Sequence, residues 1–566
     1  MSYFRILEGV RGTGLDDELM KTKGTGMKNK ILQFNLILLA VVFTVASPHL
    51  SLAGEYYVST TGSASNPGTL AQPWTLAKAN TALVAGDTVY LLAGTYSTYI
   101  NPSNSGTPSN RITYRNYGTD VITISGATYA IYLNARNYIT VQGIQATNCP
   151  RFLYILGGAH HNIIAYCSFD QQSSPDWSVS VIYQSSQYNW IHHCQFSKGG
   201  ECTAGGSDDG SVLDIGNESS ATDQTWYNLF ENNVFFHGGH HVVGLESGYN
   251  TFRNNYLHNE AWSRSRGNRS LYTNGMDAVA GRNIIEGNRF GYSDLSCDDE
   301  SIGVAVLTSA YSLFRYNKIY HGGWYGLGIG SYGGYSPGSY NRVYNNTFFN
   351  NGRLVSGGSQ DSAIWLTNSA GGTTPTGNIF KNNLYYSHYQ VYGYDGVSSG
   401  NQIFANEFNG DVLGNPLFVN ASTTPPADKT DSTLPNLDLQ AGSPAINAGG
   451  ALTTVATADT GSGTSLVLAD ARYFQDGTYA PAGTVSADWI AVGTVSNVVQ
   501  ISSINYSTNT ITLANSISRN GNDPVWLFKK SDGVQVLYGS APDAGAYEFQ
   551  QTDGPPSAPR NLRIIP

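Results

Sequence analysis

The chain has 566 residues, of which only 12% are charged, and it is rich in glycine (64 residues) and tyrosine (38 residues). Its formal net charge of −10 argues against nucleic acid as a partner and against a broadly basic surface. The length exceeds that of one compact domain, whereas a solenoid that grows in one dimension accommodates it.

Residues 1–53 are predicted to be an N-terminal extension followed by an export signal. The basic segment Met27–Lys30 precedes the apolar run ILQFNLILLAVVFTVA, and small residues follow at Ser51–Ala53. This order is typical of a cleaved signal, and the apolar run is short for a membrane span. We therefore expect a protein that is secreted or displayed at the cell surface; an N-terminal membrane anchor is the alternative.

The segment PWTLAKANTAL (Pro73–Leu83) predicts a short helix, with Pro73 near its first turn and Gly86 after its end. A helix at this place would cover the open end of a solenoid, where the edge strand would otherwise be exposed.

An eight-residue phrase then recurs, with Asn first, an apolar residue third and Asn or Cys sixth. Its copies begin 22 to 39 residues apart between Asn137 and Asn401, which is a spacing typical of repeat architectures. The alternation within each copy predicts one short strand per coil. We expect the sixth-position side chains to stack at one corner and to hydrogen-bond from coil to coil. These positions hold Gln142, Cys167, Cys194, Asn233, Asn255, Asn288, Asn317, Asn346, Asn383 and Asn406.

Two of the five cysteines, Cys167 and Cys194, hold the same position on consecutive coils. Strands about 4.8 Å apart would bring them within reach of a disulfide, although we favour two buried thiols. No CxxC pair is present, so a zinc site is not indicated.

The pattern changes near residue 415. We assign residues 55–415 to the solenoid and residues 416–550 to a closing segment. Short strands separated by Asn, Ser and Gly turns predict a small β-barrel-like insert at about residues 455–540. Residues 551–566 are similar to a linker with a vestigial fibronectin-like strand.

The first coils, YYVSTTGSASNPGTL from Tyr56 and NRITYRNYGTDVITISG from Asn110, together with the repeated phrase, resemble secreted proteins of the pectin-lyase-like superfamily. The closing motifs LDLQAGSPAINAG (Leu437–Gly449) and PDAGAYEF (Pro542–Phe549) resemble those of bacterial surface β-helix proteins. The resemblance implies an all-β, right-handed parallel β-helix with an N-terminal capping helix and a small C-terminal β insert. It also implies that the protein acts on or binds polysaccharide, but many chemistries share this fold. We expect a monomer.

Counting back from the repeated phrase places Glu246 and Asp277 on the outer face of adjacent coils, with Val243, Leu245 and Met276 inward. One strand spacing and a two-residue offset would set their backbones roughly 8 Å apart. Carboxylates about 6.5–9.5 Å apart suit an inverting glycosidase. The alternative is two solvated carboxylates on a sheet face, and a slip of one residue would turn either inward.

A second acidic group, Asp298, Asp299 and Glu300, follows Cys297 and is suited to Ca²⁺ binding or to catalysis. This region resembles polygalacturonases, whose first catalytic aspartate corresponds to Asp277 and whose aspartate pair corresponds to Asp298 and Asp299. Their histidine corresponds to Tyr325, and no Arg-Ile-Lys motif follows. No cofactor is required by this chemistry, and calcium is the one metal indicated.

The segment ESGYNTFRNN (Glu246–Asn255) is similar to the segment of chondroitinase B-like and alginate lyases that carries their catalytic lysine. Glu246 replaces that lysine, and Gly239 and His241 stand where the family has calcium-binding acids. The similarity therefore implies the fold and the carbohydrate class, but not the lyase residues.

The remaining candidates belong to the same loops. His240 or His241 could act as the base in a β-elimination, because histidine titrates near neutral pH. Trp262, Trp324 and Tyr325 are candidate platforms for sugar rings. Arg264 and Arg266 could neutralise an acidic sugar. Their alternative roles are loop packing and solvation. The segments HGGHH and HGGWY share the sequence His-Gly-Gly, and this similarity favours a turn role for His237 and His321.

Three functions remain open from the sequence. Hydrolysis of a polysaccharide by Glu246, Asp277, Asp298 and Asp299 is the first, and β-elimination is the second. The third is a non-catalytic surface solenoid that displays glycan-binding loops.

Overall fold

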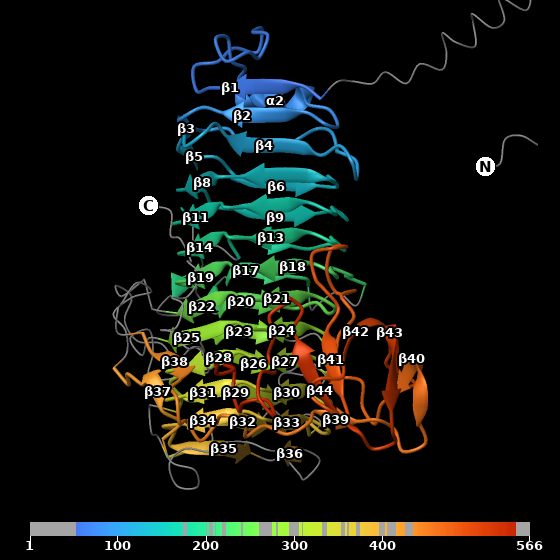
Figure 1. Cartoon of the computed structure of the whole chain (residues 1–566). Coiled ribbons are helices and arrows are strands. Elements are labelled where there is room, and N and C mark those ends of the chain that lie inside the picture. The colour runs from blue at the N-terminus through green and yellow to red at the C-terminus, as the bar shows by residue number, and fades with distance from the viewer. Residues whose placement is uncertain are drawn as a thin grey trace, which may run out of the picture. The chain divides into compact units, whose positions relative to one another are not determined.

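The computed structural model describes residues 53–550 except residues 172, 174–177, 200, 203–207, 210, 218–221, 239–240, 260–273, 279–280, 294–304, 308–309, 331–336, 353–356, 359–360, 369–373, 396–401, 405–414 and 425–433. Three long parallel sheets of 13, 11 and 10 strands run along these residues, and a typical coil contributes one strand to each sheet (Figure 1). This confirms the all-β parallel solenoid that the sequence predicts. No described helix is long and apolar enough to cross a membrane.

Sheet A contains β1 (Glu55–Val58), β2 (Thr88–Leu91), β4 (Ile112–Asn116), β7 (Ile139–Gln142), β10 (Ile163–Ala165), β13 (Trp190–His192), β18 (Leu229–Glu231), β21 (Thr251–Arg253), β24 (Ile284–Glu286), β27 (Leu313–Arg315), β30 (Arg342–Tyr344), β33 (Ile379–Lys381) and β36 (Gln402–Phe404). The repeated phrase forms these strands from β10 onward. The copy that begins at Asn137 is two residues out of register, because Ile163 pairs with Thr140.

Sheet B contains β3 (Gly94–Tyr96), β5 (Ile122–Ser125), β8 (Ile144–Thr147), β11 (Ser168–Asp170), β14 (Gln195–Ser197), β19 (Val234–Phe236), β22 (Tyr256–Asn259), β25 (Arg289–Ser293), β28 (Lys318–Tyr320), β31 (Thr347–Phe349) and β34 (Leu384–Tyr386).

Sheet C contains β6 (Ile131–Asn134), β9 (Leu153–Leu156), β12 (Val181–Ile182), β17 (Ser211–Ile215), β20 (His241–Leu245), β23 (Asn274–Ala278), β26 (Ala305–Leu307), β29 (Tyr325–Gly330), β32 (Ser362–Thr367) and β35 (Gln390–Asp395). A two-stranded ribbon, β15 (Glu201–Cys202) and β16 (Asp208–Asp209), lies between β14 and β17 in the chain.

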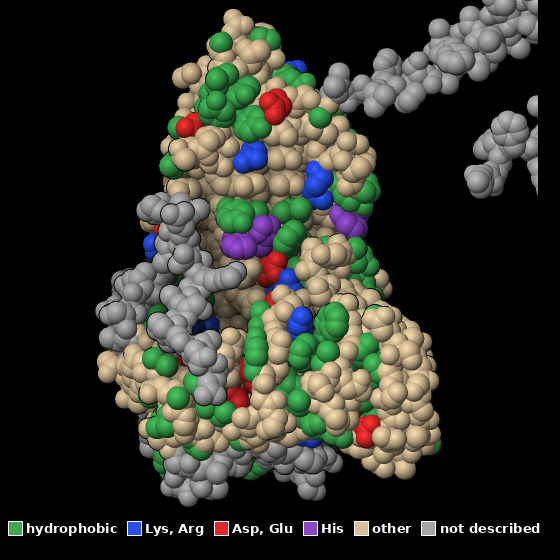
Figure 2. All heavy atoms as spheres, in the orientation of Figure 1, with side chains coloured by type: hydrophobic (Ala, Val, Ile, Leu, Met, Phe, Trp, Pro, Cys, Tyr) green, Lys and Arg blue, Asp and Glu red, His purple; other side chains and the backbone are tan. Residues whose placement is uncertain are grey.

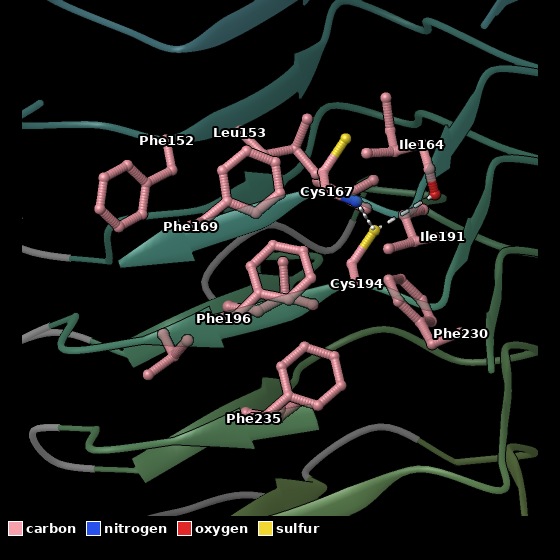
Figure 3. Close-up of a cluster of buried hydrophobic side chains, with 14 of the residues drawn as sticks. Phe152, Leu153, Ile164, Cys167, Phe169, Ile191, Cys194, Phe196, Phe230 and Phe235 are labelled. Carbon is pink, nitrogen blue, oxygen red and sulfur yellow. Dashed lines mark hydrogen bonds between the residues drawn. The ribbon is translucent and has the colours of Figure 1, made fainter. Parts of the chain in front are cut away.

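Stacks of identical or similar side chains fill the interior. The rings of Phe169, Phe196 and Phe235 lie one above another, with centroids 4.8 and 5.1 Å apart (Figure 3). Cys167 and Cys194 are free, buried thiols beside them, as the sequence favours. Each coil therefore closes around apolar residues that repeat at the strand spacing.

The predicted asparagine ladder is present at the corner between sheets A and B, from Cys167 to Asn383. Gln142 is not part of it, because it pairs in register with Ala165 rather than with Cys167, and Asn406 lies outside the described residues. The side-chain amide of each asparagine donates to the side-chain oxygen of the next, at 3.0–3.1 Å. The same oxygens accept the preceding backbone N–H groups, for example from Asn288 to Asn317 at 2.9 Å. The residue immediately before a ladder asparagine adopts the left-handed backbone conformation, for example Asn232, Asn254 and Asn345. The ladder thus satisfies polar groups that this turn would otherwise bury unpaired.

A second ladder, which the sequence analysis did not anticipate, lies at the corner between sheets C and A. It is formed by the first residue of the phrase. The amides of Asn162, Asn189 and Asn228 donate to Asn189, Asn228 and Asn250 respectively, at 3.0–3.1 Å. Where a coil carries both asparagines, such as Asn228 and Asn233, two of its corners are stabilised by the same type of hydrogen bond.

Helix α2 (Leu76–Ala82) confirms the predicted N-terminal cap. The Thr75 hydroxyl accepts a hydrogen bond from the Lys78 backbone N–H, which is a standard N-cap. Leu76 and Ala79 are buried against the first strands of the solenoid. Figure 1 shows α2 beside β1 and β2 at this end of the solenoid.

The predicted C-terminal insert is a six-stranded antiparallel barrel. It is built from β39 (Thr453–Thr454), β40 (Gly461–Val467), β41 (Trp489–Val492), β42 (Val498–Asn505), β43 (Thr510–Arg519) and β44 (Pro524–Lys529). Backbone hydrogen bonds between residues beside β39 and β40 close it, from Ala456 to Val467 and from Ala469 to Thr454.

The barrel lies against the outer face of sheet A (Figure 1). Arg315 of β27 is fully buried there and forms ion pairs with Glu286 of β24 and with Asp488 of the barrel. Burial alone would lower the pKa of the Arg315 guanidinium, but the Asp488 and Glu286 carboxylates outweigh it and raise that pKa well above its ordinary value. Ion pairs therefore join the barrel to the solenoid, in addition to apolar contacts.

The closing segment packs on sheet B. Strands β37 (Phe418–Asn420) and β38 (Asn436–Leu439) pair antiparallel, and Lys318 of β28 forms an ion pair with Asp438 at 2.6 Å. The last described residues return to the same region, where the Gly545 N–H donates to the Asn382 carbonyl. Elsewhere on the face shown in Figure 2, charged side chains are sparse.

Candidate functional site

The outer face of sheet C carries carboxylates on three consecutive coils. Asp214 of β17 pairs in register with Gly244 of β20, and Gly244 pairs with Asp277 of β23. Asp214 and Asp277 therefore occupy the same register column two strands apart, which corresponds to about 9.5 Å between backbones. Glu246 lies two residues beyond Gly244 on the coil between them.

The predicted two-residue offset between Glu246 and Asp277 is confirmed by the strand register. Val243 pairs with Met276 and Leu245 with Ala278, and Val243 and Leu245 are fully buried. Glu246 is half-buried, and its N–H donates to the Ile215 carbonyl at 2.8 Å. The side chain of Asp277 lies outside what the structure describes, so the pair is fixed at the level of the backbone.

Asp214 is the residue that the sequence analysis missed. It is 5% exposed, and its carboxylate accepts hydrogen bonds from the hydroxyls of Ser178 and Tyr183, the latter at 3.3 Å. A long connection separates Asp214 from the next copy of the phrase at Asn228, so counting back from the phrase does not assign its face. The alternation in SVLDIG (Ser211–Gly216), with an acid between two apolar residues, was the available signal.

The Tyr183 hydroxyl interacts electrostatically with both the Asp214 and the Glu246 carboxylates. Burial is the largest cause that raises the pKa of this hydroxyl, and the charges of Asp214 and Glu246 raise it further. The phenol therefore stays protonated across the physiological range and acts as a hydrogen-bond donor to Asp214. It does not suit the role of a general base.

Several predicted site residues lie outside the described part of the chain: His240, Trp262, Arg264, Arg266, Asp298, Asp299 and Glu300. The predicted calcium ligands and the predicted uronate-binding arginines are among them. His241 is the first residue of β20, and its backbone pairs with Ser211 and Asn274.

Tyr325 differs from the exposed platform that the sequence predicts. It is 3% exposed, and its ring packs against Trp365 of the next coil with centroids 5.1 Å apart. The small residue Gly328 leaves room for that ring, because a Cβ there would lie 2.7 Å from it. Tyr325 therefore packs within the coil, while Trp324 beside it is half-buried.

The predicted turn role of His237 and His321 agrees with the backbone. Both adopt the left-handed conformation, with φ of 56° and 59°. Nε2 of His321 is 2.9 Å from the Ser422 carbonyl of the closing segment. Within the described ranges, no three His, Cys, Asp or Glu side chains gather in a way that could hold a metal ion.

The chemistry available on this face is that of acids and hydroxyls. Asp214 and the backbone of Asp277 occupy one register column, Glu246 lies on the coil between them, and Tyr183 supplies a hydrogen-bond donor. Such an arrangement can protonate a leaving oxygen and activate a water molecule.

Two family models match adjacent parts of the chain. Residues 56–213 match the Pel9A-like right-handed β-helix region, and residues 215–408 match the right-handed β-helix region. Together with the strand topology, these matches show that the chain is a right-handed parallel β-helix protein. They confirm the resemblance to the pectin-lyase-like superfamily that the sequence indicates.

A curated relative, the uncharacterized protein YwoF of Bacillus subtilis (strain 168), is 38% identical over 96 residues, which is 17% of this chain. The match spans only 20% of that protein's length. It therefore covers a local segment of both proteins.

Solved structures with a similar fold include the pectate lyase Pel9A, at 16% identity and a TM-score of 0.44, covering 73% of this chain and 95% of that one. An alginate lyase from Paenibacillus sp. str. FPU-7 has 14% identity and a TM-score of 0.34, with 58% and 94% covered. The GH136 lacto-N-biosidase from Eubacterium ramulus has 13% identity and a TM-score of 0.38, with 67% and 70% covered. No residue role passes from these proteins to this chain.

Proposed function

We propose that the protein hydrolyses a polysaccharide with the carboxylates on the outer face of sheet C. The observation that carries this proposal is the placement of Asp214, Glu246 and Asp277 on three consecutive coils of one face. The polysaccharide class is supported by the match to the Pel9A-like β-helix region, named after a pectate lyase.

The spacing supports hydrolysis with inversion. The backbones of Asp214 and Asp277 are two strands apart, about 9.5 Å, and the Glu246 backbone is about 8 Å from each when its two-residue offset is included. Inverting glycosidases hold their two carboxyl groups about 6.5–9.5 Å apart so that a water molecule fits beside the sugar.

We assign water activation to Asp214, because hydrogen bonds from Ser178 and Tyr183 hold its carboxylate in one orientation. The proton donor then comes from Glu246 or Asp277 on the following coils. In this scheme Tyr183 positions Asp214 and does not itself exchange a proton.

We also propose that the protein acts outside the cell, in keeping with the export signal predicted at residues 1–53. The proposed hydrolysis requires no cofactor. Calcium bound by Asp298, Asp299 and Glu300 remains a prediction, and the assay is therefore run with and without Ca²⁺.

The test is a panel of neutral and acidic polysaccharides incubated with the purified protein. New reducing ends and unsaturated uronates are measured in parallel. We expect reducing ends without unsaturated uronates. Asp214→Asn, Glu246→Gln and Asp277→Asn should each lower the rate by at least about 100-fold, the usual contribution of a general acid or base.

Glu55→Gln is the matched control, since it removes an exposed carboxylate on β1, at the N-terminal end of sheet A. It should leave the rate unchanged. Unsaturated products would instead indicate β-elimination, with His240 or His241 as the base. Full activity in Asp214→Asn and Glu246→Gln would overturn the proposal. The absence of activity on every substrate would favour a non-catalytic surface solenoid.

A further inference from the structure

A column of aromatic rings runs along the corner between sheets C and A. Its members occupy one register position on successive coils, and each adopts a left-handed backbone conformation. The rings of Tyr138, His161, Tyr188 and Tyr227 stack in order, with centroids 4.9–5.0 Å apart. Further along the corner, Tyr311 stacks on Tyr340 at 5.0 Å.

Arg282 interrupts this column where a ring would be expected. Its guanidinium lies over the rings of Tyr249 and Tyr311, 5.8 and 4.9 Å from their centroids. Contacts with ring faces use none of the five N–H donors of a guanidinium. The side chain is exposed, and no carboxylate of a described residue lies within ion-pair distance of it. Arg282 therefore presents an uncompensated charge.

This charge faces a cavity of about 530 Å³ between the solenoid corner and the barrel. Tyr249, Arg282 and Tyr311 form the solenoid side, and Arg472, Tyr479 and Tyr506 contribute from the barrel. The volume falls in the range of about 300–1,000 Å³ that is usual for ligand sites.

The charge of the cavity is opposite to that of the whole chain. Among the described residues, two arginines line it and no aspartate or glutamate does, although the formal net charge of the chain is −10. Arg472 is paired with Asp470, but Asp470 also pairs with Arg342, so this group of three keeps one positive charge. Tyrosine rings and the amides of Gln475 and Asn509 complete the lining.

We propose that this cavity is a second, non-catalytic site that binds an acidic sugar residue of the polysaccharide. The uronate carboxylate would be held by Arg282 and Arg472, while the sugar ring packs on the tyrosines. The ligand class rests on the proposed function. Because Tyr249 follows Glu246 by three residues in the same turn, a chain held here would continue toward the face of sheet C.

The test is calorimetric titration of the full chain with trigalacturonate and with trimannuronate, with cellotriose as the neutral control. The Asp214→Asn variant is used as the background, so that hydrolysis of the sugar is slowed during the titration. We expect one of the two acidic trisaccharides to bind and cellotriose not to bind. Arg282→Gln should weaken binding at least ten-fold, and Arg282→Lys should restore part of it.

Arg115→Gln is the matched control, because Arg115 also lies over a tyrosine ring of sheet A, at 5.9 Å from Tyr90, and does not line the cavity. It should leave binding unchanged. Equal weakening by Arg115→Gln, unchanged binding in Arg282→Gln, or equal binding of cellotriose would each overturn the site. So would the absence of binding by both acidic sugars, whereas loss of the proposed hydrolysis would show separately in the reducing-end assay.

Discussion

At the scale of single residues, Glu548 in the closing segment is the carboxyl group with the clearest consequence for stability. It is 8% exposed, and its oxygens accept the backbone N–H groups of Tyr538 and Asp543. Burial, followed by the nearby Asp543 charge, raises the pKa of Glu548 to about 8 from an ordinary value of 4.5. The folded protein therefore holds this proton at neutral pH.

We predict that Glu548 makes the protein less stable as the pH rises from about 4.5 to about 8. In that window the folded state binds the proton and the unfolded state does not, so the free energy of unfolding falls with rising pH. Glu548→Gln, which mimics the protonated form, should remove this dependence. The difference between the two proteins should grow by about 1.4 kcal/mol per pH unit, measured by urea unfolding from pH 5 to pH 8. Parallel stability curves would contradict the assignment.

At the scale of the coil, the asparagine ladders decide how well the corners are satisfied. Asn317 accepts from both the backbone N–H and the side-chain amide of Asn288, and it donates to Asn346 and to the Ile285 carbonyl. Asn317→Ala would leave buried donors of Asn288 without an acceptor. We predict a loss of about 2–4 kcal/mol in the free energy of unfolding.

The control for this prediction is Asn515→Ala, at an exposed position of β43. It should change stability by no more than about 0.5 kcal/mol, as is usual for surface substitutions. If both variants unfold alike in urea, the ladder does not contribute to stability in the way proposed here.

The coil also shows which structural features could be predicted from the sequence. Periodic features were predictable because each coil repeats the same local physics: the strands, the sixth-position ladder, the buried thiols and the capping helix all follow from spacing. Asp214 was missed because its coil has a long connection that breaks the count. The first-position ladder has the same spacing as the sixth-position ladder and was equally predictable. The burial of Tyr325, in contrast, depends on contacts between coils, and the pairing of Arg315 with Asp488 joins residues 173 positions apart. No local pattern carries such information.

At the scale of the whole described unit, the barrel is joined to the solenoid through buried charge. Glu231, Arg253, Glu286 and Arg315 alternate in one register column of sheet A, on four consecutive coils. The barrel covers this column and adds Asp488 to Arg315, while the Ser531 hydroxyl donates to Glu286. The orientation of the barrel, and with it the cavity beside Arg282, depends on these pairs.

We predict that Arg315→Met weakens this junction by about 3–5 kcal/mol, because it leaves the Glu286 and Asp488 carboxylates buried without a cation. Limited proteolysis should then cut the chain between the solenoid and the barrel at lower urea concentrations than in the wild type. The triple variant Arg315→Met, Glu286→Leu, Asp488→Leu should recover much of the loss, since buried ion pairs cost desolvation that apolar groups do not. Recovery of stability without recovery of trigalacturonate binding would mean that the charges orient the barrel around the cavity. Wild-type stability in Arg315→Met would instead place the energy of the junction in its apolar contacts.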